Sequence, residues 1–257
     1  MDPDEVSAHL KLHLSERTIQ EIADLTSGQR DNSAWHWLRS KVLTASHFGR
    51  ALRASITRDP RIRRRFIESL DCKMEHLADT IPALKWGCDH EAAAIDQYSR
   101  QSGRSVEQTG LWLFPNRLLG ASPDGLIFRK QIGSNKSIEG IVEVKCPYSC
   151  RDLEWGQVLA LGKRPAFLSD DDALQINDKH DYYHQIQGQL FATNAAWCDL
   201  ITWSPYFMKV TRVMPDAAWA ANELTRLYSF CKKYLQDRAV GWKEARASEG
   251  MPCTALF

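Results

Sequence analysis

The segment that most constrains how this chain can fold is a short apolar run with two charged residues in it, Ile141-Val142-Glu143-Val144-Lys145. An apolar run of this length is typical of a buried strand. Because successive side chains of a strand point to opposite faces, Glu143 and Lys145 share one face while Val142 and Val144 point into the core. An isolated Glu-X-Lys is most often a solvated face with a weak ion pair. Here the neighbouring segments favour a functional role for the two charged residues.

The second constraining segment is Gly120-Ala121-Ser122-Pro123-Asp124-Gly125, which is followed by the apolar run Leu126-Ile127-Phe128. Pro-Asp-Gly on its own is a common turn. A hairpin between the two apolar runs, however, would place Asp124 beside Glu143. Two carboxylates and one ammonium on a single face suit a magnesium ion that holds a phosphate and a water. Phosphodiester hydrolysis is therefore the first hypothesis, with Lys145 orienting or deprotonating the attacking water.

The rest of the chain has the pattern of an α/β protein, since helical and strand-like segments alternate. Its 257 residues, 44% of them apolar, are enough for one large domain with a full core. We expect a single domain over residues 1–257, with a helical extension over residues 1–30 and a loose tail over residues 243–257. Helices are expected over residues 15–28, 86–103, 151–161, 182–190 and 216–237, and strands over residues 109–114, 118–121, 126–128, 141–145, 198–203 and 207–213.

Two helix starts carry polar groups of interest. Thr44 and Ser46 are placed to cap a helix that begins there, with backbone N–H groups free to meet a phosphate. The helix expected from Trp86 would hold Glu91 in its first turn, where the helix dipole favours an acid in any case. Each of these residues therefore also has an ordinary structural explanation.

The overall charge neither supports nor excludes a nucleic-acid partner, because 33 basic and 32 acidic residues leave a net charge of +1. A surface that binds phosphate would have to be local. One basic cluster stands out, and it is either a solvated face or an arm that contacts phosphates. Its members are Arg58, Arg61, Arg63, Arg64 and Arg65.

The cysteines indicate a reducing compartment, because there are seven of them and no pair has C-x-x-C spacing. An iron–sulfur cluster at Cys146, Cys150, Cys88 and Cys198 is an alternative that the spacing hardly supports. No apolar run is long enough to span a membrane, and no signal peptide is visible. We expect an intracellular protein of the cytoplasm or nucleus that is not secreted and has no membrane partner.

Six short motifs occur along the chain in a recognisable order. They are Ser33-Ala34-Trp35 through Arg39, Leu43-Thr44-Ala45-Ser46, Trp86-Gly87 before Glu91, Gly120–Gly125, Glu143–Pro147, and Tyr182-x-x-Gln185-x-Gln187-x-x-Leu190. In this order they resemble the lambda exonuclease and YqaJ-type viral recombinase family, from about Leu14 to about Val213. The resemblance implies a restriction-endonuclease-like, PD-(D/E)XK core. In that core a central mixed β-sheet is flanked by helices, here with extra N-terminal helices.

The resemblance also implies roles for residues of the site. Asp124, Glu143 and the Val144 carbonyl would bind the metal, and Glu91 would bind it directly or through water. Lys145 would hold the attacking water, and Gln185 would complete the site. The cofactor would be Mg²⁺, with Mn²⁺ as a substitute and one or two ions per site.

Three further residues would bind phosphate in proteins of this kind. Arg39, together with Ser46 and Ser122, would hold phosphate, and Arg39 would engage the 5′-phosphate of a DNA end. The resemblance implies a magnesium-dependent exonuclease that digests one strand of duplex DNA from a free 5′ end, for recombination by strand annealing. Its partners would be double-stranded DNA and an annealing protein, and it would act as a homotrimer or as a monomer. Two alternatives stay open: an endonuclease or structure-specific nuclease with the same site, and a non-catalytic module that binds DNA ends.

Overall fold

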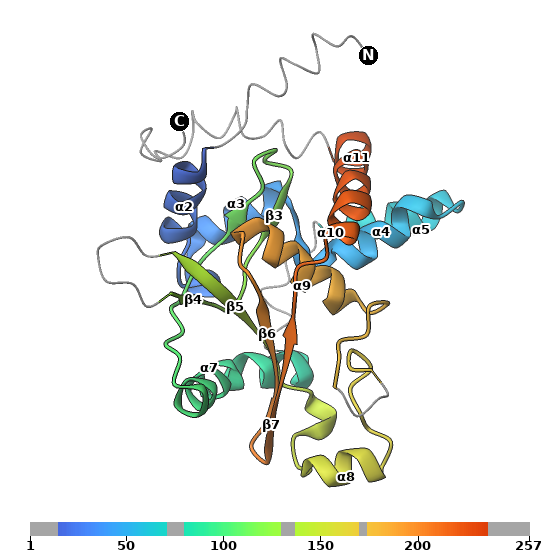
Figure 1. Ribbon diagram of the computed structural model, residues 1–257. Helices are drawn as coiled ribbons and strands as arrows, with labels where there is room; N and C mark the ends of the chain where they lie inside the picture. The colour runs from blue at the N-terminus through green and yellow to red at the C-terminus, as the bar shows by residue number, and fades with distance from the viewer. Residues whose placement is uncertain (1–14, 71–79, 130–136, 170–173, 236–257) are drawn as a thin grey trace.

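The computed structural model describes residues 15–70, 80–129, 137–169 and 174–235, and within them the strands form two sheets (Figure 1). A three-stranded sheet has the order β1-β3-β2 and a four-stranded sheet has the order β4-β5-β6-β7. The strands are β1 (Leu43–Thr44), β2 (Trp112–Leu113), β3 (Leu119–Ala121), β4 (Gly125–Phe128), β5 (Ile138–Lys145), β6 (Cys198–Ser204) and β7 (Phe207–Val213).

Helices surround these two sheets. They are α2 (Glu16–Leu25), η1 (Gln29–Asp31), α3 (Ser33–Lys41), η2 (Ala45–His47), α4 (Phe48–Ile56), α5 (Pro60–Ser69), α7 (Pro82–Ser102), η4 (Tyr148–Cys150), α8 (Trp155–Ala160), α9 (Asp181–Thr193), α10 (Ala217–Trp219), η5 (Ala220–Leu224) and α11 (Thr225–Tyr234).

The four-stranded sheet is mixed, and β5 is one of its two inner strands. β5 pairs antiparallel with β4, so that Val142 lies opposite Gly125, and it pairs parallel with β6 on its other edge. β6 and β7 form an antiparallel hairpin. The predicted β4–β5 and β6–β7 hairpins are therefore confirmed, as is the mixed α/β architecture. The strands are divided between two sheets, because β1, β2 and β3 pair only with one another in the described residues.

The two faces of β5 are covered by different helices (Figure 1). Val142 and Val144 belong to the apolar cluster that includes α7 residues, as their alternation with Glu143 predicted. Ile141 points the other way and shares a cluster with Ile186 and Leu190 of α9. Because Glu143 is two residues from Ile141, its side chain also faces α9.

Helix α9 lies unusually close to the segment that carries Ser46. A Cβ atom at Gly188 would be 2.5 Å from Cε2 of Phe48, which is fully buried at the start of α4. An ion pair between Arg53 of α4 and Asp181 at the start of α9 holds the same two helices together. These contacts hold α9 against the start of α4.

Four helix predictions differ from the structure. The helix expected over residues 151–161 is shorter, because α8 begins at Trp155 with a capping box at Glu154. Helix α7 begins at Pro82, where proline suits the first helical position, so Glu91 lies in the third turn and not the first. Thr44 and Ser46 do not cap a helix: their hydroxyls bond to each other at 3.1 Å, and the helix proper starts at Phe48. The expected single helix over residues 216–237 is interrupted by the π-helical segment η5.

The predicted N-terminal extension contributes to the core where it is described. Ile19, Ile22 and Ala23 of α2 are buried in the cluster that also contains Ile141. Residues 1–14 of the extension and the predicted loose tail over residues 243–257 lie outside the described residues. No helix in the described part of the chain is long and apolar enough to cross a membrane.

Replacing Gly188 by alanine tests the close approach of α9. The new methyl group would overlap the buried Phe48 ring, so we expect the free energy of unfolding to fall by about 1–3 kcal/mol, measured by urea denaturation. Gly156→Ala in α8 is the matched control, since nothing lies within 4 Å of its added Cβ. The control should raise stability by up to about 1 kcal/mol. A gain of stability in both variants would contradict the close packing.

Candidate active site

The carboxylate of Glu143 is the centre of the candidate site, and it is almost completely buried, with 1% of the residue exposed. Three side chains donate hydrogen bonds to it. Lys145 Nζ and Gln185 Nε2 reach Oε1 at 2.5 and 2.6 Å, and Gln189 Nε2 reaches Oε2 at 2.6 Å. A buried charge needs partners of this kind to offset the loss of water.

The local structure explains how these groups meet. Lys145 is two residues along β5 from Glu143 and therefore lies on the same face, as the sequence predicted. Gln185 and Gln189 are one turn apart on α9 and present their amides to that face. Gln189 also donates to the Ser122 carbonyl at 3.2 Å, which connects Glu143 to the turn that carries Asp124.

Asp124 lies beside β5 just where β4 starts. Its N–H donates to the Val142 carbonyl at 3.1 Å, and its carboxylate accepts from the Val144 N–H at 2.7 Å. The N–H and C=O of a strand residue point to the same edge, so the Val144 carbonyl also faces the Asp124 edge. The hairpin therefore brings Asp124, Glu143 and the Val144 main chain together, as predicted.

Glu91 reaches the same region from α7. Burial, and then the charge of Glu143, raises the pKa of Glu91 above its usual range. Burial, and then Glu143 and Glu91, raises the pKa of Asp124 well above its usual range. The three carboxylates thus repel one another through a poorly solvated space.

Lys145 is the compensating cation of this group. Burial disfavours its charge, but the carboxylates of Glu143 and Asp124 outweigh that effect, and the pKa of Lys145 is raised overall. Its ammonium also lies 4.3 Å from the ring centroid of Tyr182, a cation–π contact. At neutral pH Lys145 is a hydrogen-bond donor.

The donor set fits a hard divalent cation. Asp124, Glu143 and the Val144 carbonyl supply oxygen ligands, and the raised pKa values of Asp124 and Glu91 show a local excess of negative charge. Among the described residues no three His, Cys, Asp or Glu side chains form a group that could hold a metal by themselves. The fit consequently rests on two carboxylates and a main-chain oxygen, with the charge of Glu91 acting on the same region.

The absence of such a group among the described residues also concerns the iron–sulfur alternative. Within the described ranges, no thiols cluster with the spacing of an iron–sulfur site. Cys88, Cys146, Cys150 and Cys198 are free thiols. Burial, and then the charges of Glu91 and Asp124, raises the pKa of the Cys146 thiol to about 12, so it stays neutral.

Two of the predicted phosphate-binding residues, Ser46 and Ser122, lie on segments that contact α9, and Arg39 lies on α3. Arg39 is half-buried and stacks on Trp35, with 4.2 Å from its guanidinium carbon to the ring centroid. Burial lowers the pKa of Arg39 to about 10, so it remains a cation at neutral pH. The indole Nε1 of Trp35 donates to Ser122 Oγ at 2.9 Å. Ser46 lies on η2, which contacts both α9 and β3.

Sequence reasoning missed two residues that organise the site. Gln189 shares a helix face with Gln185, and that spacing was the available signal for its contact with Glu143. Trp35 is four residues before Arg39 on α3, a spacing that allows the stacking seen. Both roles depend on contacts between distant segments.

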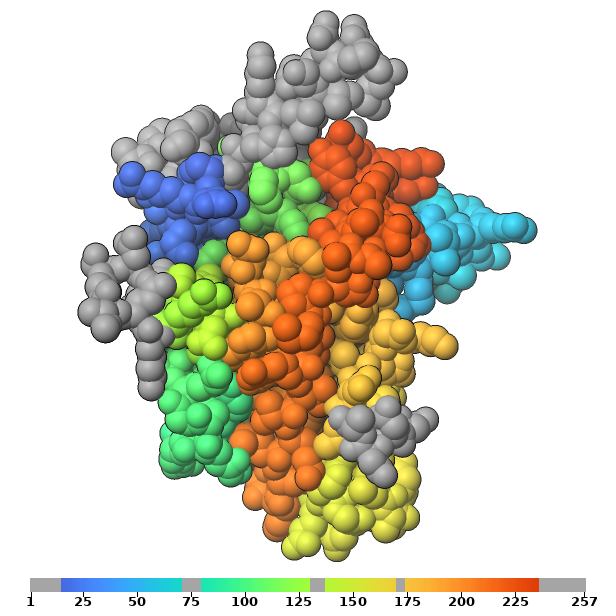
Figure 2. Space-filling model, in the orientation of Figure 1, coloured from blue at the N-terminus to red at the C-terminus, as the bar shows by residue number. Residues whose placement is uncertain are grey.

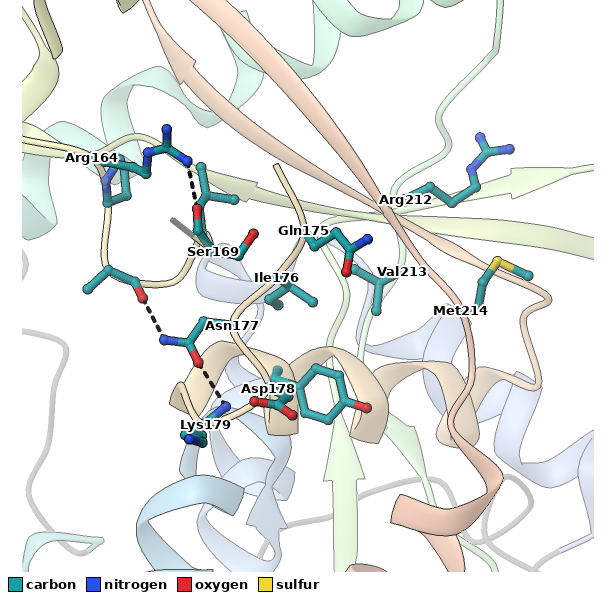
Figure 3. A pocket seen from close by; sticks show the side chains of 14 residues that line it. Arg164, Ser169, Gln175, Ile176, Asn177, Asp178, Lys179, Arg212, Val213 and Met214 are labelled. Atoms are coloured by element: carbon teal, nitrogen blue, oxygen red, sulfur yellow. Dashed lines mark hydrogen bonds between the residues drawn. The ribbon is translucent and has the colours of Figure 1, made fainter. Parts of the chain in front are cut away.

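A cavity of about 910 Å³ lies elsewhere, and its lining contains none of the candidate site residues (Figure 3). It is formed by the connection after α8, by Tyr183 and by the end of β7. Arg164 donates to the Ser169 carbonyl at 2.7 Å and Asn177 donates to the Ala166 carbonyl at 3.2 Å, which shapes this connection (Figure 3). The cavity is thus separate from the carboxylate group.

Residues 34–196 match the model of the YqaJ-like viral recombinase domain, which is more than half of the chain. The chain belongs to the YqaJ-like viral recombinase family. The matched residues include all of the candidate site, from Arg39 to Gln189. Among curated proteins the chain has no match.

Solved structures show the same fold. LHK-Exo, an alkaline exonuclease from Laribacter hongkongensis, aligns with a TM-score of 0.55 and 23% identity over 84% of this chain and 98% of that chain, and its complex with dAMP gives the same values. The SOX–RNA complex of KSHV aligns with a TM-score of 0.55 and 13% identity over 88% of this chain and 76% of that chain. The predicted restriction-endonuclease-like fold is therefore confirmed.

The role of Gln189 can be tested by a double-mutant cycle. Gln189→Leu removes a hydrogen bond to a buried carboxylate, so we expect the free energy of unfolding to fall by about 1.5–3 kcal/mol at neutral pH. In a Glu143→Gln background, where no charge needs support, the same change should cost clearly less. Urea denaturation of the four proteins gives the coupling. An equal cost in both backgrounds would mean that Gln189 does not support the Glu143 charge.

Proposed function

We propose that this protein is a metal-dependent deoxyribonuclease that digests linear duplex DNA from a 5′-phosphorylated end. The observation that carries this proposal is the convergence of Asp124, Glu143 and Lys145 at one end of β5, with Glu91 close by. Two carboxylates with a neighbouring lysine are the groups that a phosphodiester hydrolase needs. Membership of a recombinase family and a fold shared with an alkaline exonuclease support it.

The cofactor of this reaction would be Mg²⁺, with Mn²⁺ as a substitute. Asp124, Glu143 and the Val144 carbonyl would hold it, with Glu91 acting directly or through water. When bound, one or two such ions offset the charge that develops on the phosphate oxygens. Gln185 and Gln189 keep the Glu143 carboxylate in one orientation through their amide donors. Lys145, held as an ammonium, donates to the attacking water and orients it.

The 5′ end would be held by Arg39 with Ser46 and Ser122. In the described part of the chain no carboxylate pairs with Arg39, so its cation is available to an anion. Ser122 Oγ accepts a hydrogen bond from Trp35, which leaves its own proton free to donate. A guanidinium can give two parallel hydrogen bonds to a terminal phosphate, which a hydroxyl end cannot match.

Nucleic acid is also the ligand in structures of related fold. One is described as a complex of SOX with DNA, with a TM-score of 0.52 and 12% identity over 83% of this chain and 70% of that chain. For this chain the proposed substrate is double-stranded DNA with free ends, resected for recombination by strand annealing. An annealing protein as partner and a trimeric or monomeric state complete the proposal. An endonuclease with the same site is the competing function, and nicked circular DNA separates the two.

The first test is digestion of a linear duplex that carries 5′-phosphates. Activity should require Mg²⁺ or Mn²⁺ and disappear with a chelator, while Ca²⁺ should bind without supporting turnover. Asp124→Asn is the matched inactive control, and nicked circular duplex is the control for internal cutting. Full activity of the pure protein in chelator would overturn the metal mechanism. Equal cutting of the circle would favour the endonuclease.

A second test concerns the 5′-phosphate. The parent protein should digest 5′-phosphorylated ends faster than 5′-hydroxyl ends, and Arg39→Ala should remove most of that preference. A charge-assisted contact of about 1.5–3 kcal/mol corresponds to roughly a tenfold to hundredfold rate difference. Arg39→Lys keeps the charge but not the fork, so it should restore only part of the preference. Equal parent rates on both ends would refute the role of Arg39 and leave the direction of digestion open.

A further inference from the structure

The positive charge of this chain is concentrated in one segment. Residues 50–69 contain seven arginines and two acidic residues, a net charge of +5, whereas the whole chain has a net charge of +1. The remainder of the chain is therefore net negative. The segment comprises α4 after its first two residues and all of α5, and it projects from the side of the molecule (Figure 2).

One arginine of the segment holds α5 in place. Arg63 donates to the carbonyls of Ala54 at 3.2 Å and Thr57 at 2.7 Å, and it stacks on Tyr234 of α11. It thus satisfies carbonyl groups at the end of α4. Phe66, one turn further along α5, is buried beside it. Arg63 and Phe66 mark the inner face of α5, and this arginine is structural.

The opposite face of α5, together with Arg58 in the connection that precedes this helix, is exposed and basic. Arg58, Arg64 and Arg65 are all exposed, and none of them has a hydrogen bond or ion pair within the described residues. Arg61 differs because it pairs with Asp59 at 3.0 Å. In the sequence these five arginines form one cluster. In the structure two of them, Arg61 and Arg63, bond to the protein, and the other three are exposed and have no such bond within the described residues.

The exposed arginines of this segment lie within reach of a duplex whose 5′ end is held at Ser46. Helix α4 follows η2 directly, and its nine residues span about 14 Å. Helix α5, with ten residues, adds at most about 15 Å. The three residues that join the two helices, 57–59, add up to about 10 Å. The exposed arginines are therefore at most about 40 Å from Ser46, or roughly twelve base pairs of duplex at 3.4 Å each.

We propose that Arg58, Arg64 and Arg65 form a second DNA-binding surface, which contacts the phosphate backbone of the duplex within about one helical turn of the end being digested. This inference rests on the proposed function. Arginine suits phosphate through its fork of donors, and contacts of this kind carry no base sequence. The surface would hold the duplex while the terminal nucleotide is removed. It would thereby prolong each run of digestion without taking part in the chemistry.

The test compares two triple variants that remove the same charge. Arg58→Gln, Arg64→Gln and Arg65→Gln together alter the surface. Arg17→Gln, Arg100→Gln and Arg129→Gln together remove three exposed arginines from α2, α7 and the end of β4. Binding of a 5′-phosphorylated duplex of about 20 base pairs is measured against salt, in a Glu143→Gln background that prevents digestion.

The surface variant should flatten the slope of log affinity against log salt by about 2–3, while the control variant should keep the parent slope. With the catalytic residue intact, the surface variant should release long duplexes after shorter runs but digest a duplex of about five base pairs at the parent rate. If the surface variant keeps the salt slope of the parent protein, this proposal is overturned, and a protein partner becomes the alternative ligand of this face. Equal flattening in both variants would also overturn it, because total charge would then explain the effect. A parent protein that neither binds nor digests duplex DNA would instead refute the proposed function itself.

Discussion

The burial of the Glu143 charge is the constraint on which the rest of the site depends. A carboxylate that is 1% exposed is stable only if donors replace its water, and here they come from Lys145, Gln185 and Gln189. Two of the three donors lie on α9, so the Glu143 charge is stabilised only if that helix is in its present position. The close packing of Gly188 on Phe48 constrains that position as well. Fold and site are therefore linked through α9.

The hydrogen-bond donors around Glu143 do not offset all of the negative charge in the site. Asp124 and Glu91 add two more carboxylates to a space with one ammonium, and the raised pKa values of both acids report the resulting repulsion. Groups arranged in this way are unfavourable for the folded protein by itself and are common where a cation or a reaction supplies the compensation. Gln189 shows the same imbalance, since its buried Oε1 has no hydrogen-bond partner among the described residues while both its donors are used. In the proposed function, the same arrangement that lowers stability would prepare the site to bind a positive ion.

The parts of this structure that the sequence predicted are those set by local rules. Alternation along β5 was enough to put Glu143 and Lys145 on one face, and two apolar runs around a turn were enough to pair β4 with β5. The predicted start of α7 at Trp86 is wrong, although proline at residue 82 is typical of the first position of a helix. Local rules could not predict the contact between Gln189 and Glu143, because it depends on where α9 packs against β5. The same limit applies to Trp35 and Ser122, which are 87 residues apart in the chain.

The bond between Trp35 and Ser122 also explains how end recognition and cleavage can be coupled. Arg39 stacks on Trp35, Trp35 donates to the hydroxyl of Ser122, and the carbonyl of Ser122 accepts from Gln189, which holds Glu143. Trp35 and Gln189 are both buried, so close packing restricts the positions open to these two links. In the proposed function, a phosphate bound at Arg39 would thereby be kept at a set position relative to the carboxylates. Since a displacement of about 1 Å can reduce a rate a hundredfold, such a fixed spacing is a direct way to make cleavage depend on an anchored end.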